Sequence, residues 1–202
     1  MNKVTAAITA VGKYVPDYVL TNKELETMVE TNDEWIVSRT GIKERRILKE
    51  EGKGTSYLAV KSAQDLIKKT NLDPKEIEMV ILCTATRDMQ AASTGAYVAA
   101  EIGAVNAFAF DLDSACSSFL YGLSVAGGYI ESGRYKKILL IGADKNSSMI
   151  DYTDRATCII FGDGAGAVLI EPTADGNGLQ DEYLRTDGSG REFLNVAAGG
   201  SV

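Results

Sequence analysis

A run of residues without any charge, from 115 to 130, constrains the fold of this chain more than any other feature. A short aromatic segment, residues 107–112, precedes the run and is typical of a strand. The run is too short, and too rich in serine and glycine, to cross a bilayer. It therefore predicts a helix that is buried on every side, which requires a layer of structure on each face. This chain need not supply both layers.

Small residues recur at every fourth position along the predicted helix, at Ser118, Gly122 and Ala126. Larger apolar side chains, including Phe119 and Leu123, mark a second face. A stripe of small side chains allows another backbone to come close. We therefore expect this helix to pack tightly along the stripe.

Cys116 lies at the junction between the predicted strand and the predicted helix. At a sharp strand-to-helix turn its sulfur would face the N–H groups and the positive dipole end of the helix, where a thiolate is favoured. The same N–H groups can donate to a developing oxyanion, as in other nucleophile elbows. The alternative is that Cys116 is a small buried hydrophobic residue. The residues alone leave both interpretations open.

The other two cysteines, Cys83 and Cys158, lie in apolar runs and are predicted to be core residues. The chain has three cysteines at wide spacings and no histidine, so we expect neither a structural metal nor a disulfide framework. The net charge of -7 argues against nucleic acid as a partner, because binding of the phosphate backbone needs a basic surface.

The N-terminal residues 1–11 place a lysine before a short apolar stretch. This stretch alternates with threonine and lacks a cleavage context, so we expect a strand and not a signal peptide. The sequence therefore predicts no membrane segment and a cytoplasmic protein with reduced thiols.

Two capping boxes predict helix starts, at residues 21–24 and 31–34, each with threonine first and glutamate fourth. In the second of these helices Trp35 and Arg39 are four residues apart and share a face. An aromatic plane beside a guanidinium can stack an adenine and hold a phosphate. The alternative is a surface arginine that lies over a half-buried tryptophan, and the spacing does not decide between them.

Strands and helices alternate along the rest of the chain, which predicts an α/β fold with a largely parallel sheet and right-handed crossovers. Gly12 with Pro16 marks the turn out of the first strand. The glycine-rich residues 162–167 lead into a strand and not a helix, so a nucleotide-binding loop is rejected in favour of tight packing at a strand entry. The predicted strands are 4–11, 79–83, 107–112, 137–142 and 165–170, and the remaining predicted helices are 55–69 and 93–102.

Four motifs in order cover essentially the whole chain. They are residues 33–42 followed by Arg45 and Arg46, the elbow at 115–117, residues 154–157, and residues 161–166. Together they resemble β-ketoacyl-[acyl carrier protein] synthase III, the initiating condensing enzyme of bacterial fatty-acid synthesis. The resemblance implies a thiolase-like fold, in which two similar halves, each with a mixed five-stranded sheet, enclose the buried elbow helices.

The resemblance further implies that Cys116 takes an acyl group from an acyl-CoA, with acetyl-CoA as the expected donor. Decarboxylation of malonyl-[acyl carrier protein] would then supply a carbanion for a Claisen condensation. Trp35, Arg39 and Arg155 match the positions that grip coenzyme A, and Thr31 lies beside them. Coenzyme A enters as a thioester substrate, so no resident cofactor and no metal are expected. The implied partners are acyl-CoA, acyl carrier protein and a second copy of the chain in a homodimer.

The family's catalytic histidine and asparagine belong to the second half, and this chain contains no histidine. The resemblance therefore covers an N-terminal thiolase-like half, residues 1–202, with the C-terminal half absent from this chain. Such a half alone is expected to be limited to thioacylation.

Two departures from the family's pattern also stand out. Ala91 and Ala92 replace a Phe-Pro pair whose ring closes a neighbouring subunit's acyl pocket, so that pocket should be wider. Ser118 replaces a glycine, which questions tight packing at the elbow.

Two other function classes stay open. The chain could be a non-catalytic module whose apolar helix face pairs with a copy of itself or with a separate C-terminal half. A cysteine-dependent hydrolase or redox enzyme is a weaker alternative, because neither a histidine base nor a resolving cysteine supports it.

Overall fold

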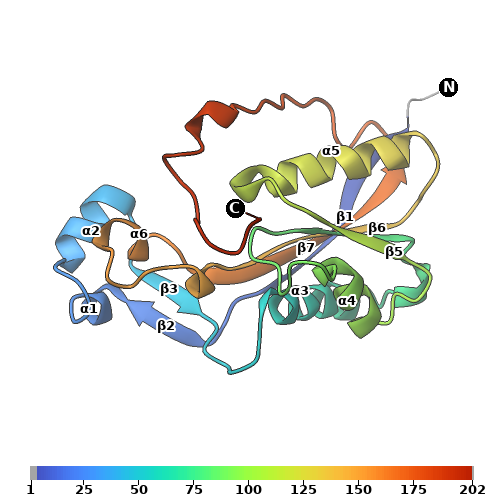
Figure 1. Cartoon of the computed structure of the whole chain (residues 1–202). Helices are drawn as coiled ribbons and strands as arrows, with labels where there is room; N and C mark the ends of the chain where they lie inside the picture. Colours follow the sequence, from blue (N-terminus) through green and yellow to red (C-terminus); the bar gives the residue numbers. More distant parts are fainter. Residues whose placement is uncertain (1–3, 202) are drawn as a thin grey trace.

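The computed structural model describes residues 4–201 and centres on a mixed five-stranded sheet (Figure 1). The strands β4, β5 and β6 run parallel to one another, whereas β7 is antiparallel to both β6 and β1. The sheet order is β1 (Thr5–Tyr14), β7 (Asp163–Thr173), β6 (Ile138–Lys145), β4 (Met79–Cys83) and β5 (Phe108–Leu112).

The prediction of a largely parallel sheet is therefore wrong for β7 only, because β1, which is antiparallel to β7, runs in the same direction as β4, β5 and β6. The reason lies in the chain between β6 and β7, residues 146–162, which leaves and rejoins the sheet at the same end. Lys145 at the end of β6 pairs with Asp163 at the start of β7. A connection that starts and finishes at the same end of the sheet joins antiparallel strands, whereas parallel strands need a crossover connection along the face of the sheet.

Helices cover both faces of the sheet. On one face α3 (Thr55–Thr70) and α4 (Thr94–Glu101) pack on Val80 and Leu82 of β4, and on the other face α5 (Ser118–Glu131) packs on Met79 and Ile81. Successive residues of β4 thus serve opposite faces, as the two-residue period of a strand requires. All five residues of β4 are buried, which explains its uninterrupted apolar sequence.

Gly12 is a point of close helix contact and not a turn, because β1 continues through it to Tyr14. A Cβ atom at Gly12 would lie 2.3 Å from the carbonyl oxygen of Ser62 and 2.6 Å from the nitrogen of Leu66, both in α3. The glycine therefore lets α3 settle directly on β1, and the predicted turn is wrong.

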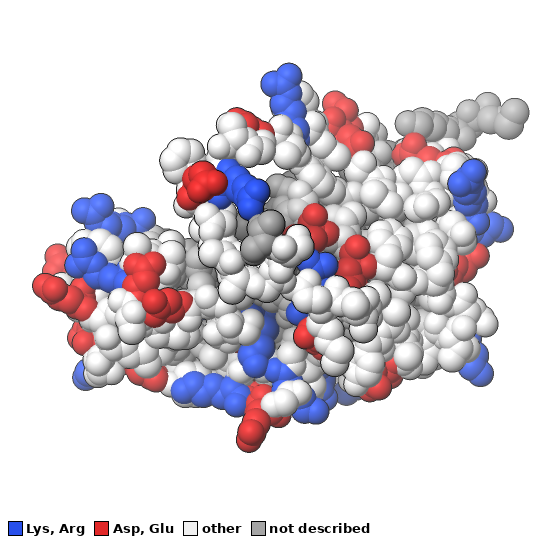
Figure 2. Space-filling model, viewed as in Figure 1, with Lys and Arg blue, Asp and Glu red and all other residues white. Residues whose placement is uncertain are grey.

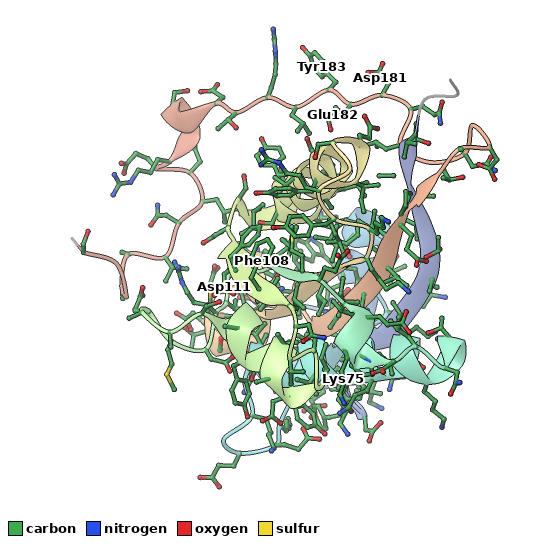
Figure 3. All side chains as sticks on the ribbon, turned by 90° about the vertical axis from the view of Figure 1, so that its right-hand side faces the viewer. Lys75, Phe108, Asp111, Asp181, Glu182 and Tyr183 are labelled. Atoms are coloured by element: carbon green, nitrogen blue, oxygen red, sulfur yellow. The ribbon has the colours of Figure 1, made fainter. Side chains whose placement is uncertain are left out.

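The helix α5 is buried on its sheet side only. Along the predicted stripe Ser118, Gly122 and Ala126 are buried, whereas Leu120 on the opposite side is 59% exposed. The extended residues 180–187 pass over that outer side, where Ser124 Oγ donates to Glu182 at 2.9 Å (Figure 3). Among residues 4–201, no helix or sheet covers this outer face, so this part of the chain supplies one of the two layers that the sequence predicts.

A smaller lobe extends from one end of the sheet (Figure 1, left). Its two-stranded antiparallel sheet of β2 (Tyr18–Thr21) and β3 (Glu44–Ile47) was not predicted from the sequence. The lobe also contains α1 (Asn22–Leu25), α2 (Asp33–Thr40) and α6 (Arg155–Cys158) around a separate apolar core. The lobe thus joins two segments that are distant in the sequence, residues 18–47 and 146–162.

The two capping predictions have different outcomes. Thr21 caps α1 and accepts a hydrogen bond from the Glu24 N–H at 3.1 Å, as predicted. The second helix begins one residue later than expected, because Asn32 takes the cap position and accepts from the Trp35 N–H at 2.8 Å. Asparagine caps at least as well as threonine, which leaves Thr31 outside the helix. None of the described helices combines the length and the apolar composition needed to span a bilayer.

Candidate functional site

The chain turns sharply from β5 into α5 at Cys116, as the sequence predicts. A short 3-10 turn, η2 (Ala115–Ser117), joins the two elements. Ala115 adopts a left-handed conformation with φ of +47°, a region that costs free energy for any residue with a Cβ atom. Cys116 follows directly and its side chain is exposed. The strained residue therefore presents the thiol outward at the end of a rigid parallel strand.

Ser118 stabilises this turn from inside. Its hydroxyl accepts a hydrogen bond from the Ser114 N–H at 2.6 Å and donates one to the Ala115 carbonyl at 2.8 Å. The side chain is only 3% exposed, so both bonds are shielded from water. The departure from glycine at this position thus adds a polar bridge across the elbow, and tight packing is retained.

The thiol of Cys116 opens on a cavity of about 280 Å³ between the first turn of α5 and the end of β6. Asp144 and Asn146 supply polar groups to its wall, and Asn146 Nδ2 donates to the Gly162 carbonyl at 3.2 Å. At the start of η2 the Asp113 carboxylate accepts a hydrogen bond from the Ala115 N–H at 3.1 Å, and no side chain within residues 4–201 caps α5. The predicted preference for a thiolate at Cys116 stays a prediction.

The other two cysteines are core residues, as predicted. Burial and then the charge of Asp144 raise the pKa of Cys83 to about 12, and burial also raises the pKa of Cys158. Cys83 packs beneath α5, where a Cβ atom at Gly122 would lie 2.6 Å from its sulfur. Of the three thiols, only that of Cys116 is therefore exposed.

The predicted binding residues gather in the lobe. The Arg39 guanidinium carbon lies 5.2 Å from the centroid of the Trp35 ring, and that of Arg155 lies 5.1 Å from the same centroid. Arg155 also donates to the Glu30 carbonyl at 3.1 Å. The Trp35 ring with its two guanidinium groups forms a site with flat and positively charged surfaces. Such a site suits a ligand in which an aromatic ring carries phosphates. We call these residues, with Thr31, the lobe cluster.

Thr31 contributes an unusual feature to this cluster. Its hydroxyl oxygen is buried and has no hydrogen-bond partner among the described residues. A buried polar atom without a partner costs roughly 1–3 kcal/mol. Thr31 directly follows Glu30, whose carbonyl accepts the hydrogen bond from Arg155. A ligand atom that reached this hydroxyl would remove that cost.

The lobe cluster and the nucleophile occupy separate places. None of the lobe-cluster residues lines the Cys116 cavity. Residues 146–162 connect the two places. The first and last residues of this segment, Asn146 and Gly162, line the cavity, whereas Arg155, between them in the sequence, belongs to the lobe cluster. Ala91 and Ala92 are exposed and do not line this cavity either, so their predicted effect on a neighbouring subunit stays a prediction.

Asp163 fastens the connecting segment, and sequence reasoning assigned it no role. Its carboxylate accepts hydrogen bonds from the N–H groups of Leu48 and Ser147, both at 2.8 Å, and from the Ser147 hydroxyl at 2.6 Å. The glycine-rich run 162–167 therefore marks the entry to β7, as predicted, with an aspartate that anchors the lobe to the sheet. In the sequence, only the position of Asp163 between two glycines pointed to such a role.

Comparison with known proteins supports the resemblance. Residues 110–188 match the family model described as 3-oxoacyl-[acyl-carrier-protein] synthase III. The whole chain is 56% identical to β-ketoacyl-[acyl-carrier-protein] synthase III 2 of Bacteroides thetaiotaomicron, of which it covers 60%. The chain thus spans about three fifths of the length of that curated relative.

Solved structures give the same result for the fold. The synthase III of Thermus thermophilus matches with a TM-score of 0.88 and 41% identity, over 92% of this chain and 57% of that one. The priming β-ketosynthase of the R1128 polyketide pathway matches with a TM-score of 0.80 and 34% identity, over 84% and 50% of the two chains. The fold is the thiolase-like α/β fold of these proteins, with its mixed five-stranded sheet.

Proposed function

We propose that this chain, related over its whole length to β-ketoacyl-[acyl carrier protein] synthase III, is the nucleophile-bearing N-terminal half of such an enzyme. In this proposal Cys116 accepts an acyl group from an acyl-CoA, with acetyl-CoA as the donor. The observation that carries the proposal is the exposed thiol of Cys116, presented by a strained elbow at the mouth of a cavity.

The transfer requires one nucleophilic displacement. The sulfur of Cys116 attacks the thioester carbonyl, and the bond from that carbonyl to the sulfur of coenzyme A breaks. The proton that leaves the cysteine thiol ends on the departing coenzyme A sulfur, so the products are an acyl-cysteine and free coenzyme A. The backbone N–H of Cys116, inside the turn η2, is suited to stabilise the oxyanion of the tetrahedral intermediate.

The second step of the proposed reaction is decarboxylation of a malonyl group on acyl carrier protein, followed by condensation. The enolate formed on decarboxylation needs hydrogen-bond donors in a dry site. The chain contains no histidine to serve there. We therefore assign the first half-reaction to this chain and the second to residues of a C-terminal half.

The lobe cluster is proposed to hold the nucleotide part of coenzyme A. The Trp35 ring offers a stacking surface for adenine, and Arg39 and Arg155 offer positive charge for phosphates. The unpartnered hydroxyl of Thr31 supports the same assignment, because a ligand would supply its missing hydrogen bond. Coenzyme A acts here as a substrate and not as a resident cofactor.

Assembly and location belong to the same proposal. Residues 1–202 form one thiolase-like half that works with a C-terminal half, as a homodimer in the cytoplasm that receives acyl carrier protein. The strand β5 lies at the edge of the sheet with Phe108 partly exposed, which supports pairing with a second copy (Figure 3).

The test is the intact mass of the protein after incubation with acetyl-CoA. We expect the mass of one acetyl group to be added, and peptide mapping should place it on Cys116. The variant Cys116→Ser should gain no thioester, whereas Cys83→Ser should be acetylated like the wild type. An unmodified mass for a wild type whose thiol reacts with iodoacetamide would contradict the proposal.

A second candidate function rests on the open outer face of α5. Leu120 is exposed there, and Figure 2 shows mostly uncharged surface, with scattered charges of both signs, to the right of the lobe. Such a surface suits a non-catalytic module that pairs with its own copy or with a separate C-terminal half. A monodisperse monomer in light scattering would count against this function.

A further inference from the structure

Arg45 is a buried cation at the base of the lobe. It belongs to β3 and is only 4% exposed. Its Nε donates to the Ile159 carbonyl at 2.9 Å, its Nη2 donates to the same carbonyl, and its Nη1 donates to the Asn22 side-chain oxygen. No ion pair joins it to a carboxylate within residues 4–201. Its charge is thus satisfied by neutral oxygens alone.

This arrangement is costly. Burial lowers the pKa of Arg45 below its usual value, which shows that the charged form is disfavoured where it lies. An apolar side chain of similar volume would fill the same space without that cost. What only arginine provides is a planar fork with several fixed donors. The contacts of that fork should therefore explain why the residue is there.

The fork connects the two parts of the lobe that carry the lobe cluster. Ile159 directly follows α6, the short helix that begins with Arg155. Asn22, on the other side of the fork, donates from its amide nitrogen to Asp33 at 2.7 Å and to the Ile42 carbonyl at 2.9 Å. Asp33 is the first residue of α2 and Ile42 follows its C-cap, so Asn22 holds both ends of that helix.

We propose that Arg45 is a positioning residue for the lobe cluster, because it sets the spacing between α6 and α2. Arg155 comes from α6, whereas Trp35 comes from α2, and the 5.1 Å contact between them depends on that spacing. Arg45 itself need not touch the ligand. This inference rests on the proposed function, since it assigns the role of the lobe cluster to binding of coenzyme A.

The experiment compares Arg45→Lys with Arg46→Lys. Lysine keeps the charge but has one nitrogen in place of the three that donate to Ile159 and Asn22, whereas Arg46 is the half-exposed neighbour and serves as the matched control. Trp35 is the only tryptophan, so its fluorescence and its quenching by iodide report on the lobe cluster without any ligand. Titration with coenzyme A gives the affinity, and the alkylation rate of Cys116 reports on the elbow.

We expect Arg45→Lys to alter iodide quenching of Trp35 and to weaken binding of coenzyme A roughly tenfold or more, as loss of hydrogen bonds to a charged group implies. The alkylation rate of Cys116 should not change, and Arg46→Lys should resemble the wild type. A folded Arg45→Lys protein with unchanged quenching and unchanged affinity would overturn the inference.

A second pair of variants covers the case in which Arg45→Lys fails to fold. Asp33→Ala removes the acceptor for Asn22, whereas Asp33→Asn keeps an oxygen there. We expect the first to change Trp35 quenching and the second to restore it, and equal quenching in both would overturn the inference. If the wild type does not bind coenzyme A while Arg45→Lys still alters quenching, the proposed function fails and the positioning role stands.

Discussion

The elbow and the lobe obtain their geometry in opposite ways. At the elbow the residues that hold Cys116 are its near neighbours in the sequence, Ser114 and Ser118, which follow the edge strand β5. In the lobe the defining contacts join distant segments, as in the hydrogen bond from Arg155 to Glu30. The comparison teaches that the nucleophile depends on local backbone conformation, whereas the binding cluster depends on how two segments dock. Changes in one region should therefore leave the other largely intact.

The largest effect is expected where α5 meets the sheet. A Cβ atom at Gly122 would lie 2.6 Å from Cys83 and 2.7 Å from Leu140, so Gly122→Ala should destabilise the protein by about 2 kcal/mol. It should also slow alkylation of Cys116, because the elbow moves with α5. The control is Gly128→Ala on the same helix, where no atom lies within 4 Å of the added Cβ, which should be neutral or stabilising. Equal urea midpoints for the two variants would show that α5 is not closely packed.

The lobe is tested separately by Arg155→Ala. This change removes a guanidinium from the Trp35 ring and a hydrogen bond to Glu30, so affinity for coenzyme A should fall roughly tenfold, or about 1.4 kcal/mol. Calorimetric titration measures the affinity. Alkylation of Cys116 by iodoacetamide should keep its wild-type rate, and a slower rate would mean that the two regions are coupled.

A smaller effect is expected from Ser118→Ala, which removes the bridge between Ser114 and Ala115. Loss of this buried bridge should cost about 1 kcal/mol and reduce the acetylation rate at Cys116 several-fold, with affinity for coenzyme A unchanged. Ser118→Cys retains a weak donor, so its acetylation rate should lie between those of the wild type and of Ser118→Ala. The account of the elbow would be wrong if Ser118→Ala acetylated Cys116 at the wild-type rate.

The smallest effect concerns pH. The pKa of Cys83 is raised from 9.0 to about 12, so above pH 9.0 the unfolded chain loses this proton before the folded protein does. Stability contributed by the neutral thiol is therefore complete below pH 9.0 and decreases as the pH rises toward about 12. Urea unfolding of the wild type and of Cys83→Ala should show a weaker alkaline loss in the variant. Parallel pH dependences would contradict the assignment.

The same comparison explains what could be predicted from the sequence. The elbow was predictable because the aromatic strand, Cys116 and the uncharged run are adjacent, although the bridge made by Ser118 was not. In the lobe the four-residue spacing placed Arg39 beside Trp35, whereas Arg155 was assigned only through the family resemblance. Nothing in the sequence marked Arg45 as buried, because its partners are a distant carbonyl and an amide.

The direction of β7 was missed for a related reason. Residues 146–162 lie between two apolar strands. A crossover helix needs a connecting segment of similar length, so the sequence pattern favoured a parallel arrangement. In the structure these residues build part of the lobe and return to the same end of the sheet. Side-chain contacts between distant segments, such as those of Asp163, decide this path.

The central claim is that the elbow performs the transfer while the lobe binds the nucleotide, and the rate of acetylation of Cys116 tests it most directly. Wild type and Arg155→Ala would be compared with acetyl-CoA and with a short acetyl thioester that lacks the nucleotide. The account predicts that Arg155→Ala requires roughly tenfold more acetyl-CoA to reach half of an unchanged maximal rate, and that both proteins react equally with the short thioester. The same half-saturating concentration of acetyl-CoA for both proteins, or acetylation of a residue other than Cys116, would contradict it.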